Sequence, residues 1–127
     1  MHEEMQLPWS IKCSLNNNFD KESSLLLQVI HGIADKHKYG VVREFVGHGV
    51  GRHFHSMPTV PHCRNSEQSI MTPGQTFTIE PMLTERGVKG RMWRDNWTVV
   101  TTDGGLAAQY EHTIYITENG HEVLTLP

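Results

Sequence analysis

The sequence predicts an α+β fold in which one helix is followed by antiparallel strands. Apolar residues recur at helical spacing in one segment, between about residues 21 and 37. Beyond residue 40, short β-prone runs alternate with turn signals rich in glycine, proline and asparagine. An Asn-Gly dipeptide at positions 119–120 separates the last two runs and indicates a β-hairpin. A chain of 127 residues is long enough for one domain.

The predicted helix extends from about residue 21 to residue 37, and Asp20 can cap its first turn. Its apolar positions follow one helical face: Leu26, Val29, Ile30 and Ile33. Gly40 is expected to end the helix, because glycine readily adopts the left-handed conformation that closes a last turn. The preceding residues match no pattern, so 1–20 is an unassigned segment and 21–127 is the expected domain.

Five β-prone runs follow the helix: 41–46, 76–80, 97–101, 109–117 and 121–126. Glycines at positions 47, 49 and 51 end the first run and predict a loop there. The second run is the most regular, since Phe77 and Ile79 alternate with polar residues, of which Glu80 is the last. The Pro73-Gly74 dipeptide before it is typical of a type II turn.

Composition excludes several classes of protein. No apolar run approaches the ~18 residues that a membrane span requires, which predicts no membrane association. A formal net charge of −3 provides no general positive field, so no nucleic-acid partner is expected. Two cysteines cannot build a disulfide framework, and the acidic start shows no signal or transit peptide, which makes the cytoplasm the default location. Nine histidines hint at metal chemistry.

Three positions combine metal-binding chemistry with a suitable side-chain direction: His48, Glu80 and Glu111. Glu80 lies on the polar face of its run, and Pro81 ends ladder pairing directly after it. Glu111 lies on the polar face of the run 109–117. His48 lies between two glycines, whose missing side chains let another group or an ion come close. Two carboxylates and an imidazole form a mixed oxygen and nitrogen set that suits Mn, Fe, Co or Zn.

Each of these positions also has a structural explanation. A glutamate on a strand is often a solvated surface residue, and Gly-His-Gly can be a tight turn. His53 and His55 would share one face of an extended segment. A further alternative is a structural zinc module of His53, His55, His62 and Cys63, although its spacing fits no regular pattern.

Four motifs occur in an order that resembles a known family. They are Gly47-His48-Gly49-Val50-Gly51, Phe54-His55, Phe77-Thr78-Ile79-Glu80-Pro81-Met82 and Ala108-Gln109-Tyr110-Glu111-His112-Thr113. Together they resemble the C-terminal half of a type I methionine aminopeptidase, a metallopeptidase with the pita-bread fold. The resemblance extends from about residue 21 to the C terminus and implies a partial pita-bread fold. It implies removal of N-terminal methionine from a peptide or nascent chain, and association with the ribosome.

The resemblance also implies a metal centre. His48, Glu80 and Glu111 match metal ligands of the family, with Glu111 at the position that bridges two divalent ions. The implied cofactors are ions of Co, Mn, Fe or Zn. Glu80 is in addition implied as a catalytic residue that relays the proton of the attacking water.

Contacts with the substrate are implied for three residues. His55 matches the catalytic histidine that contacts the scissile carbonyl and stabilises the developing oxyanion. Phe54 and Trp97 match walls of the pocket for the methionine side chain. Aromatic walls suit this side chain, because its flexible thioether packs well against apolar rings.

The sequence departs from the family pattern at two metal ligands. The family's site uses two strand aspartates upstream of its histidine ligand, and none of the aspartates here, at positions 20, 35, 95 and 103, has that context. We therefore expect no stable dinuclear site and at most one weakly held ion in this chain alone. Half of a pita-bread sheet would also expose strand edges, which predicts partial unfolding, aggregation or dimerisation.

The missing aspartates leave two functional hypotheses. The chain is an incomplete form of the aminopeptidase, or it is a non-catalytic fragment of the pita-bread fold that binds peptides or proteins. An incomplete N terminus would also lack any transit peptide, so an organelle is the alternative to the cytoplasm.

Overall fold

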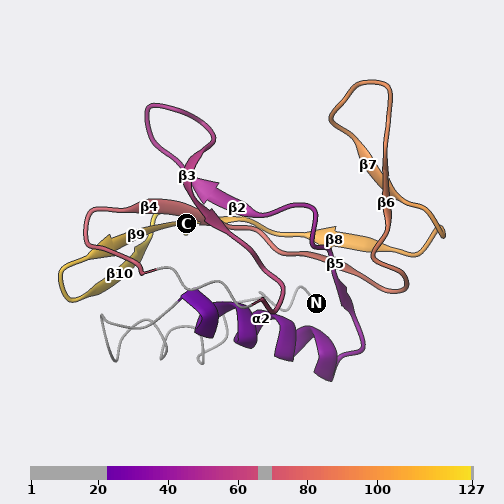
Figure 1. Cartoon of the computed structure of the whole chain (residues 1–127), viewed down its shortest axis with the longest axis horizontal. Helices are drawn as coiled ribbons and strands as arrows, with labels where there is room; N and C mark the ends of the chain where they lie inside the picture. Colours follow the sequence, from indigo (N-terminus) through magenta and orange to yellow (C-terminus); the bar gives the residue numbers. More distant parts are fainter. Residues whose placement is uncertain (1–22, 66–69, 127) are drawn as a thin grey trace.

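The chain folds as a helix packed against antiparallel sheets in the computed structural model, which describes residues 23–65 and 70–126. Helix α2 (Ser23–Lys36) lies along one face of the strands, and two loops project from the opposite face (Figure 1). The predicted cap Asp20 and the segment 1–20 lie outside the described residues. Within the described ranges, no helix has the length and apolar character needed to cross a bilayer.

Helix α2 buries its predicted apolar face. Ile30 and Ala34, one turn apart, are 7% and 1% exposed, and Val29 packs against the cluster that contains Ile30. Ile33 is partly buried, whereas the side chain of Leu26 lies outside the described residues. The helical period therefore identified the buried side of the helix from Val29 onward.

Helix α2 ends at Lys36, within one residue of the predicted end at about residue 37, but the terminating role predicted for Gly40 is wrong. Lys38 has a left-handed conformation with φ of 60°, and the Tyr39 N–H donates to the Ala34 carbonyl oxygen at 2.9 Å. This hydrogen bond closes the last turn, so a lysine takes the position that glycine usually occupies. Gly40 instead begins the first strand.

Ten strands follow the helix within the described residues: β1 (Gly40–Val41), β2 (Gly47–Gly49), β3 (Ser56–Val60), β4 (Thr76–Ile79), β5 (Met82–Thr84), β6 (Gly90–Met92), β7 (Val99–Thr101), β8 (Ala107–Gln109), β9 (His112–Thr117) and β10 (Gly120–Val123). All their pairings are antiparallel, as predicted. One sheet has the order β10-β9-β4-β2-β3, a second has the order β1-β5-β8, and β6 pairs with β7.

The two larger sheets meet at two interrupted strands, which we call the sheet junction. β4 passes into β5 through Glu80 and Pro81, and β8 passes into β9 through Tyr110 and Glu111. Since β9 pairs with β4 and β8 pairs with β5, the two interruptions lie side by side (Figure 1). The prediction of one strand over 109–117 is therefore wrong, because side-chain alternation continues through the point where the pairing changes sheets.

The segment 41–49 also differs from its prediction. Residues 41–46 do not form one strand, and the predicted glycine loop contains β2. A Cβ at Gly47 would collide with the carbonyl oxygen of Thr78, and one at Gly49 with that of Met57. The missing side chains therefore permit the close approach of adjacent strands, as expected of a group next to His48.

Two predicted turns are present. The Gln75 N–H donates to the Thr72 carbonyl oxygen at 3.2 Å, and Gly74 has φ of 90°, as a type II turn requires. The hairpin of β9 and β10 also forms, but its turn residues are 118–119, and Gly120 belongs to the second strand. The hairpin was thus predicted correctly and its turn was placed one residue too late.

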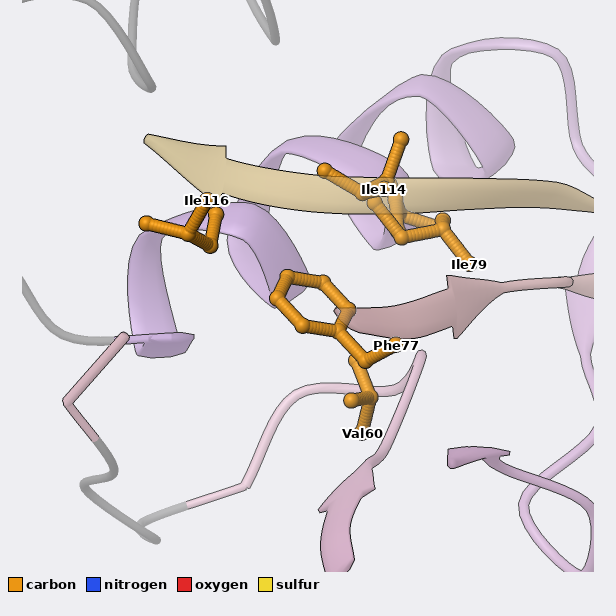
Figure 2. Close-up of a cluster of buried hydrophobic side chains, with 6 residues drawn as sticks. Val60, Phe77, Ile79, Ile114 and Ile116 are labelled. Carbon is orange, nitrogen blue, oxygen red and sulfur yellow. The ribbon is translucent and has the colours of Figure 1, made fainter. Parts of the chain in front are cut away.

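The main core lies between α2 and the five-stranded sheet. Six buried side chains form it: Ile30, Val60, Phe77, Ile79, Ile114 and Ile116. Figure 2 shows the five from the strands gathered beside the helix. Phe77 and Ile114 face each other across β4 and β9 and are 1% and 0% exposed. This packing anchors the two strands whose ends carry Glu80 and Glu111.

Candidate metal centre

His48, Glu80 and Glu111 come together at the sheet junction. His48 lies in β2, Glu80 directly follows β4, and Glu111 directly precedes β9. Because β2 pairs with β4 and β4 pairs with β9, neighbouring strands deliver the three side chains to one place. One donor atom from each residue lies within 4.8 Å of the other two. No other group of three His, Cys, Asp or Glu residues converges in this way in the described part of the chain.

The geometry of His48 favours a cation between the side chains. Its Nε2 lies 3.4 Å from Glu80 Oε1, and the two side chains are 13% and 14% exposed. Its Nδ1 lies 3.1 Å from the Gly49 carbonyl oxygen, which can only accept, so Nδ1 carries the proton. In the neutral imidazole, Nε2 then directs its lone pair at the Glu80 carboxylate. A cation between them would stabilise these two facing lone pairs.

The donor set fits a divalent transition metal. With metal–ligand bonds of about 2.0–2.2 Å, adjacent donor atoms lie about 3 Å apart and opposite ones about 4 Å apart. The observed separations of 3.4 Å and at most 4.8 Å need only a small contraction. Glu111, the third member, is exposed and can move toward the other two. One imidazole and two carboxylates suit several first-row metals, and the geometry does not select one.

Three neighbours hold Glu80 in place. The Thr78 hydroxyl donates to Glu80 Oε1 at 2.7 Å, and the Gln109 side-chain amide donates to Oε2 at 3.1 Å. The His62 Nε2 accepts the backbone N–H of Glu80 at 3.0 Å, so the ring is neutral. Burial lowers the pKa of His62 to about 4, and this outweighs the opposing hydrogen bond to the Phe45 backbone.

The contact between His62 and Glu80 was not predicted from the sequence. His62 was considered in a zinc module with His53, His55 and Cys63, but these four residues do not form a metal-binding group. Cys63 is a buried free thiol packed against Ala34 of the helix. No local pattern distinguishes His62 from the other histidines, because its partner lies 18 positions away.

The loop between β2 and β3 brings His55 and Phe54 to the metal-binding group. The ring centroids of His48 and His55 are 4.2 Å apart, and those of Phe54 and His55 are 4.5 Å apart. Phe54 is 67% exposed, so most of its ring surface is free to contact another molecule. The predicted extended segment around His53 is wrong, since residues 51–55 form a series of bends. The bends turn His55 back onto His48.

Trp97 lies apart from the other predicted site residues. It belongs to the turn between β6 and β7 and is 75% exposed. It makes no ring contact with the histidines or Phe54 in the described residues. The β6–β7 hairpin and the loop that carries Phe54 nevertheless project from the same side of the sheets, opposite to α2 (Figure 1).

The aspartates of the described residues serve other structures. Asp35 pairs with Arg64, with 2.6 Å between the charged atoms. Asp95 and Asp103 accept hydrogen bonds within turns, chiefly from Thr98 and Gly105, and these bonds lower the pKa of both carboxyls. None of the three joins the metal-binding group.

A model of metallopeptidase family M24 matches residues 22–118 of this chain. The chain is 63% identical over 98 residues to methionine aminopeptidase 1D, chloroplastic/mitochondrial, of Arabidopsis thaliana, covering 77% of this chain and 28% of that protein. It is 50% identical over 93 residues to methionine aminopeptidase 1 of Saccharomyces cerevisiae, covering 72% and 24%. The chain thus spans about a quarter of the length of these curated relatives.

Solved structures show the same fold. Methionine aminopeptidase from Rickettsia prowazekii superposes with a TM-score of 0.80 at 34% identity, covering 93% of this chain and 49% of that one. Prolidase from Pyrococcus furiosus superposes with a TM-score of 0.58 at 20% identity, covering 92% and 31%, which supports the fold alone. The helix and antiparallel sheets described above therefore form part of the pita-bread fold.

Proposed function

This chain belongs to metallopeptidase family M24, and we propose that it carries metal-binding and substrate-facing residues of an aminopeptidase that removes N-terminal methionine. The observation that carries the proposal is the convergence of His48, Glu80 and Glu111 within 4.8 Å. His55 and Phe54 flank this group at ring-contact distances. A hydrolytic metallopeptidase needs this combination of ligands, a hydrogen-bond donor and an apolar wall.

The three converging residues would hold the cation. A bound divalent cation supplies Lewis acidity, which polarises a carbonyl group and lowers the pKa of a water molecule. The proposed metals are Co, Mn, Fe or Zn, since all accept mixed imidazole and carboxylate ligands. Without the family's two aspartates, we expect this chain alone to hold at most one ion, and weakly.

The chain's own residues supply proton transfer and charge stabilisation. The Glu80 carboxylate accepts a proton from the attacking water and passes it to the leaving amine as the C–N bond after methionine breaks. The His55 imidazole donates a hydrogen bond to the carbonyl oxygen as negative charge develops there. Phe54 provides one apolar wall for the methionine side chain, and Trp97 is proposed as a second wall from the neighbouring hairpin.

The proposed substrate is the N-terminus of a peptide or nascent chain, with ribosome association as a further expectation of the family resemblance. The cytoplasm is the default location. An organelle is the alternative, supported by the relative from Arabidopsis thaliana whose name includes chloroplastic/mitochondrial.

A second candidate is a non-catalytic module that binds peptides or proteins. It is favoured by one observation, namely that Asp35, Asp95 and Asp103 all have structural partners away from the metal-binding group. Such a module would bind a methionine-led peptide through the same exposed ring of Phe54 without cleaving it.

One assay separates the two candidates. Methionine release from a Met-Ala-Ser peptide is measured with added Co²⁺ or Mn²⁺ for the wild-type chain and for Glu111→Gln. Glu118→Gln is the matched control, because Glu118 is an exposed turn residue outside the metal-binding group. Release that Glu111→Gln abolishes and Glu118→Gln preserves supports the enzyme. Binding of the peptide without release supports the module.

A further inference from the structure

The backbone of Glu80 needs hydrogen-bond partners that the sheets do not provide. Glu80 lies between the end of β4 and the start of β5, where ladder pairing is interrupted. Pro81 follows it and has no N–H to donate. A part-buried N–H or carbonyl group without a partner is costly, so both backbone groups of Glu80 require partners from elsewhere.

Two side chains satisfy these backbone groups. The His62 Nε2 accepts the Glu80 N–H at 3.0 Å, and the Gln109 amide donates to the Glu80 carbonyl oxygen at 3.3 Å. His62 is 2% exposed, so water does not compete for this bond. Gln109 ends β8, two residues before Glu111. The backbone of Glu80 is thereby held by β8, the strand that leads to Glu111.

The carboxylate of Glu80 is held by a second set of bonds. Oε1 accepts from the Thr78 hydroxyl at 2.7 Å, and Oε2 accepts from the Gln109 amide at 3.1 Å. The same Thr78 hydroxyl accepts the backbone N–H of His48 at 3.0 Å. Thr78 is 1% exposed and thus joins two of the three metal-binding residues through one buried oxygen.

We propose that His62, Thr78 and Gln109 are positioning residues that hold the Glu80 carboxylate in its ligand geometry before the cation arrives. This inference rests on the proposed metal centre. A glutamate side chain has several rotatable bonds, and a cation that had to immobilise them would bind more weakly. Partners that orient a ligand are worth about 10- to 100-fold in metal affinity. All three residues hydrogen-bond to Glu80, and Thr78 also accepts the backbone N–H of His48.

Thr78 allows the sharpest test. In Thr78→Val the shape is nearly kept and the hydroxyl is lost, whereas in Thr78→Ser the hydroxyl stays. Binding of Co²⁺ to the full chain is measured by calorimetry and by visible absorption of the bound ion. Thr78→Val is expected to weaken Co²⁺ binding about 10- to 100-fold, and Thr78→Ser to bind like the wild type. Thermal unfolding without metal checks whether both variants fold.

Three further variants, at Gln109 and His62, keep the test decisive if a substitution at Thr78 prevents folding. Gln109→Met removes the amide donor at an exposed position, where the new side chain has room. His62→Leu removes the acceptor, and His62→Gln restores an acceptor at nearly the same reach. The amide resonance of Glu80 is followed by nitrogen–proton correlation spectra without metal. It is expected to shift in His62→Leu and to return in His62→Gln.

The outcomes separate a failure of the proposed metal centre from a failure of the positioning inference. If Co²⁺ binding to the wild type is absent, or is unchanged by His48→Ala and Glu111→Gln, the proposed metal centre is wrong, and the positioning inference fails with it. If Co²⁺ binds through these ligands and folded Thr78→Val and Gln109→Met bind it as tightly as the wild type, only the positioning inference is wrong. Weakened binding in both folded variants supports it.

Discussion

At the sheet junction, Glu80 is held by residues 2, 18 and 29 positions away in the chain. In the β6–β7 hairpin, Asp95 is held by residues only two and three positions away. The first arrangement exists only when several strands have assembled, whereas the second can form from one short segment. We therefore expect changes at the junction to affect the whole fold and the metal centre, and changes in the hairpin to remain local.

The largest difference in the free energy of unfolding is expected between substitutions of two aromatic side chains, one from each region. Phe77 of β4 is 1% exposed, and Trp97 of the hairpin is 75% exposed. Phe77→Ala should lower the free energy of unfolding by about 3–5 kcal/mol, because it opens a cavity in the core. Trp97→Ala should change it by less than about 0.5 kcal/mol. Urea unfolding followed by circular dichroism measures both, and equal effects would contradict the comparison.

The buried histidine at the junction predicts a dependence of stability on pH. The pKa of His62 is lowered from 6.5 to about 4, so the unfolded chain takes up the proton at higher pH than the folded chain. The stabilisation from neutral His62 is complete above pH 6.5 and is lost as the pH falls toward 4. It amounts to about 3 kcal/mol.

The measurement is urea unfolding of the metal-free chain between pH 7.5 and 4.5, compared with His62→Gln. Other acidic groups titrate in both proteins, so only the difference between the two curves reports on His62. The wild type should lose more stability over this range than the variant. Parallel curves would show that His62 is not the responsible group.

A smaller effect on the free energy of unfolding is expected when a methyl group is added at the sheet junction. The Cβ of Gly47→Ala would meet the Thr78 carbonyl oxygen, whereas a Cβ at Gly51 would meet nothing within 4 Å. Gly47→Ala should therefore lower the free energy of unfolding by about 1–3 kcal/mol and also weaken Co²⁺ binding, since strands β2 and β4 must separate. Gly51→Ala is the control and should behave like the wild type in both measurements.

The smallest effect is expected in the β6–β7 hairpin, where loss of one carboxylate should change hydrogen exchange at two nearby amides only. The Asp95 carboxylate accepts from the backbone N–H groups of Trp97 and Thr98 at 3.0 and 2.9 Å. Asp95→Ala should speed hydrogen exchange at these two amides, because their acceptor is gone. Co²⁺ binding and exchange in β4 and β9 should not change. Faster exchange in those strands would mean that the two regions are coupled after all.

Prediction from the sequence succeeded where the determinants are local. The alternation around Phe77, the turn at Gly74 and the apolar face of the helix each depend on residues a few positions apart. The candidate ligands were selected by side-chain direction and by family resemblance, and the structure brings all three together. Prediction failed where contacts between distant residues determine the structure. The strand expected over 109–117 is one case, because its two parts pair with different strands.

Local patterning in the chain was sufficient to define the helix, the strand around Phe77, the C-terminal hairpin and the chemical types at the candidate metal centre. It could not show that Tyr110 and Glu111 interrupt a strand, because alternation says nothing about which strand lies alongside. Nor could it select His62 among nine histidines. Its contact with Glu80 depends on the packing of β3 and β4 around a shared core, and that packing brings together residues that no local pattern connects.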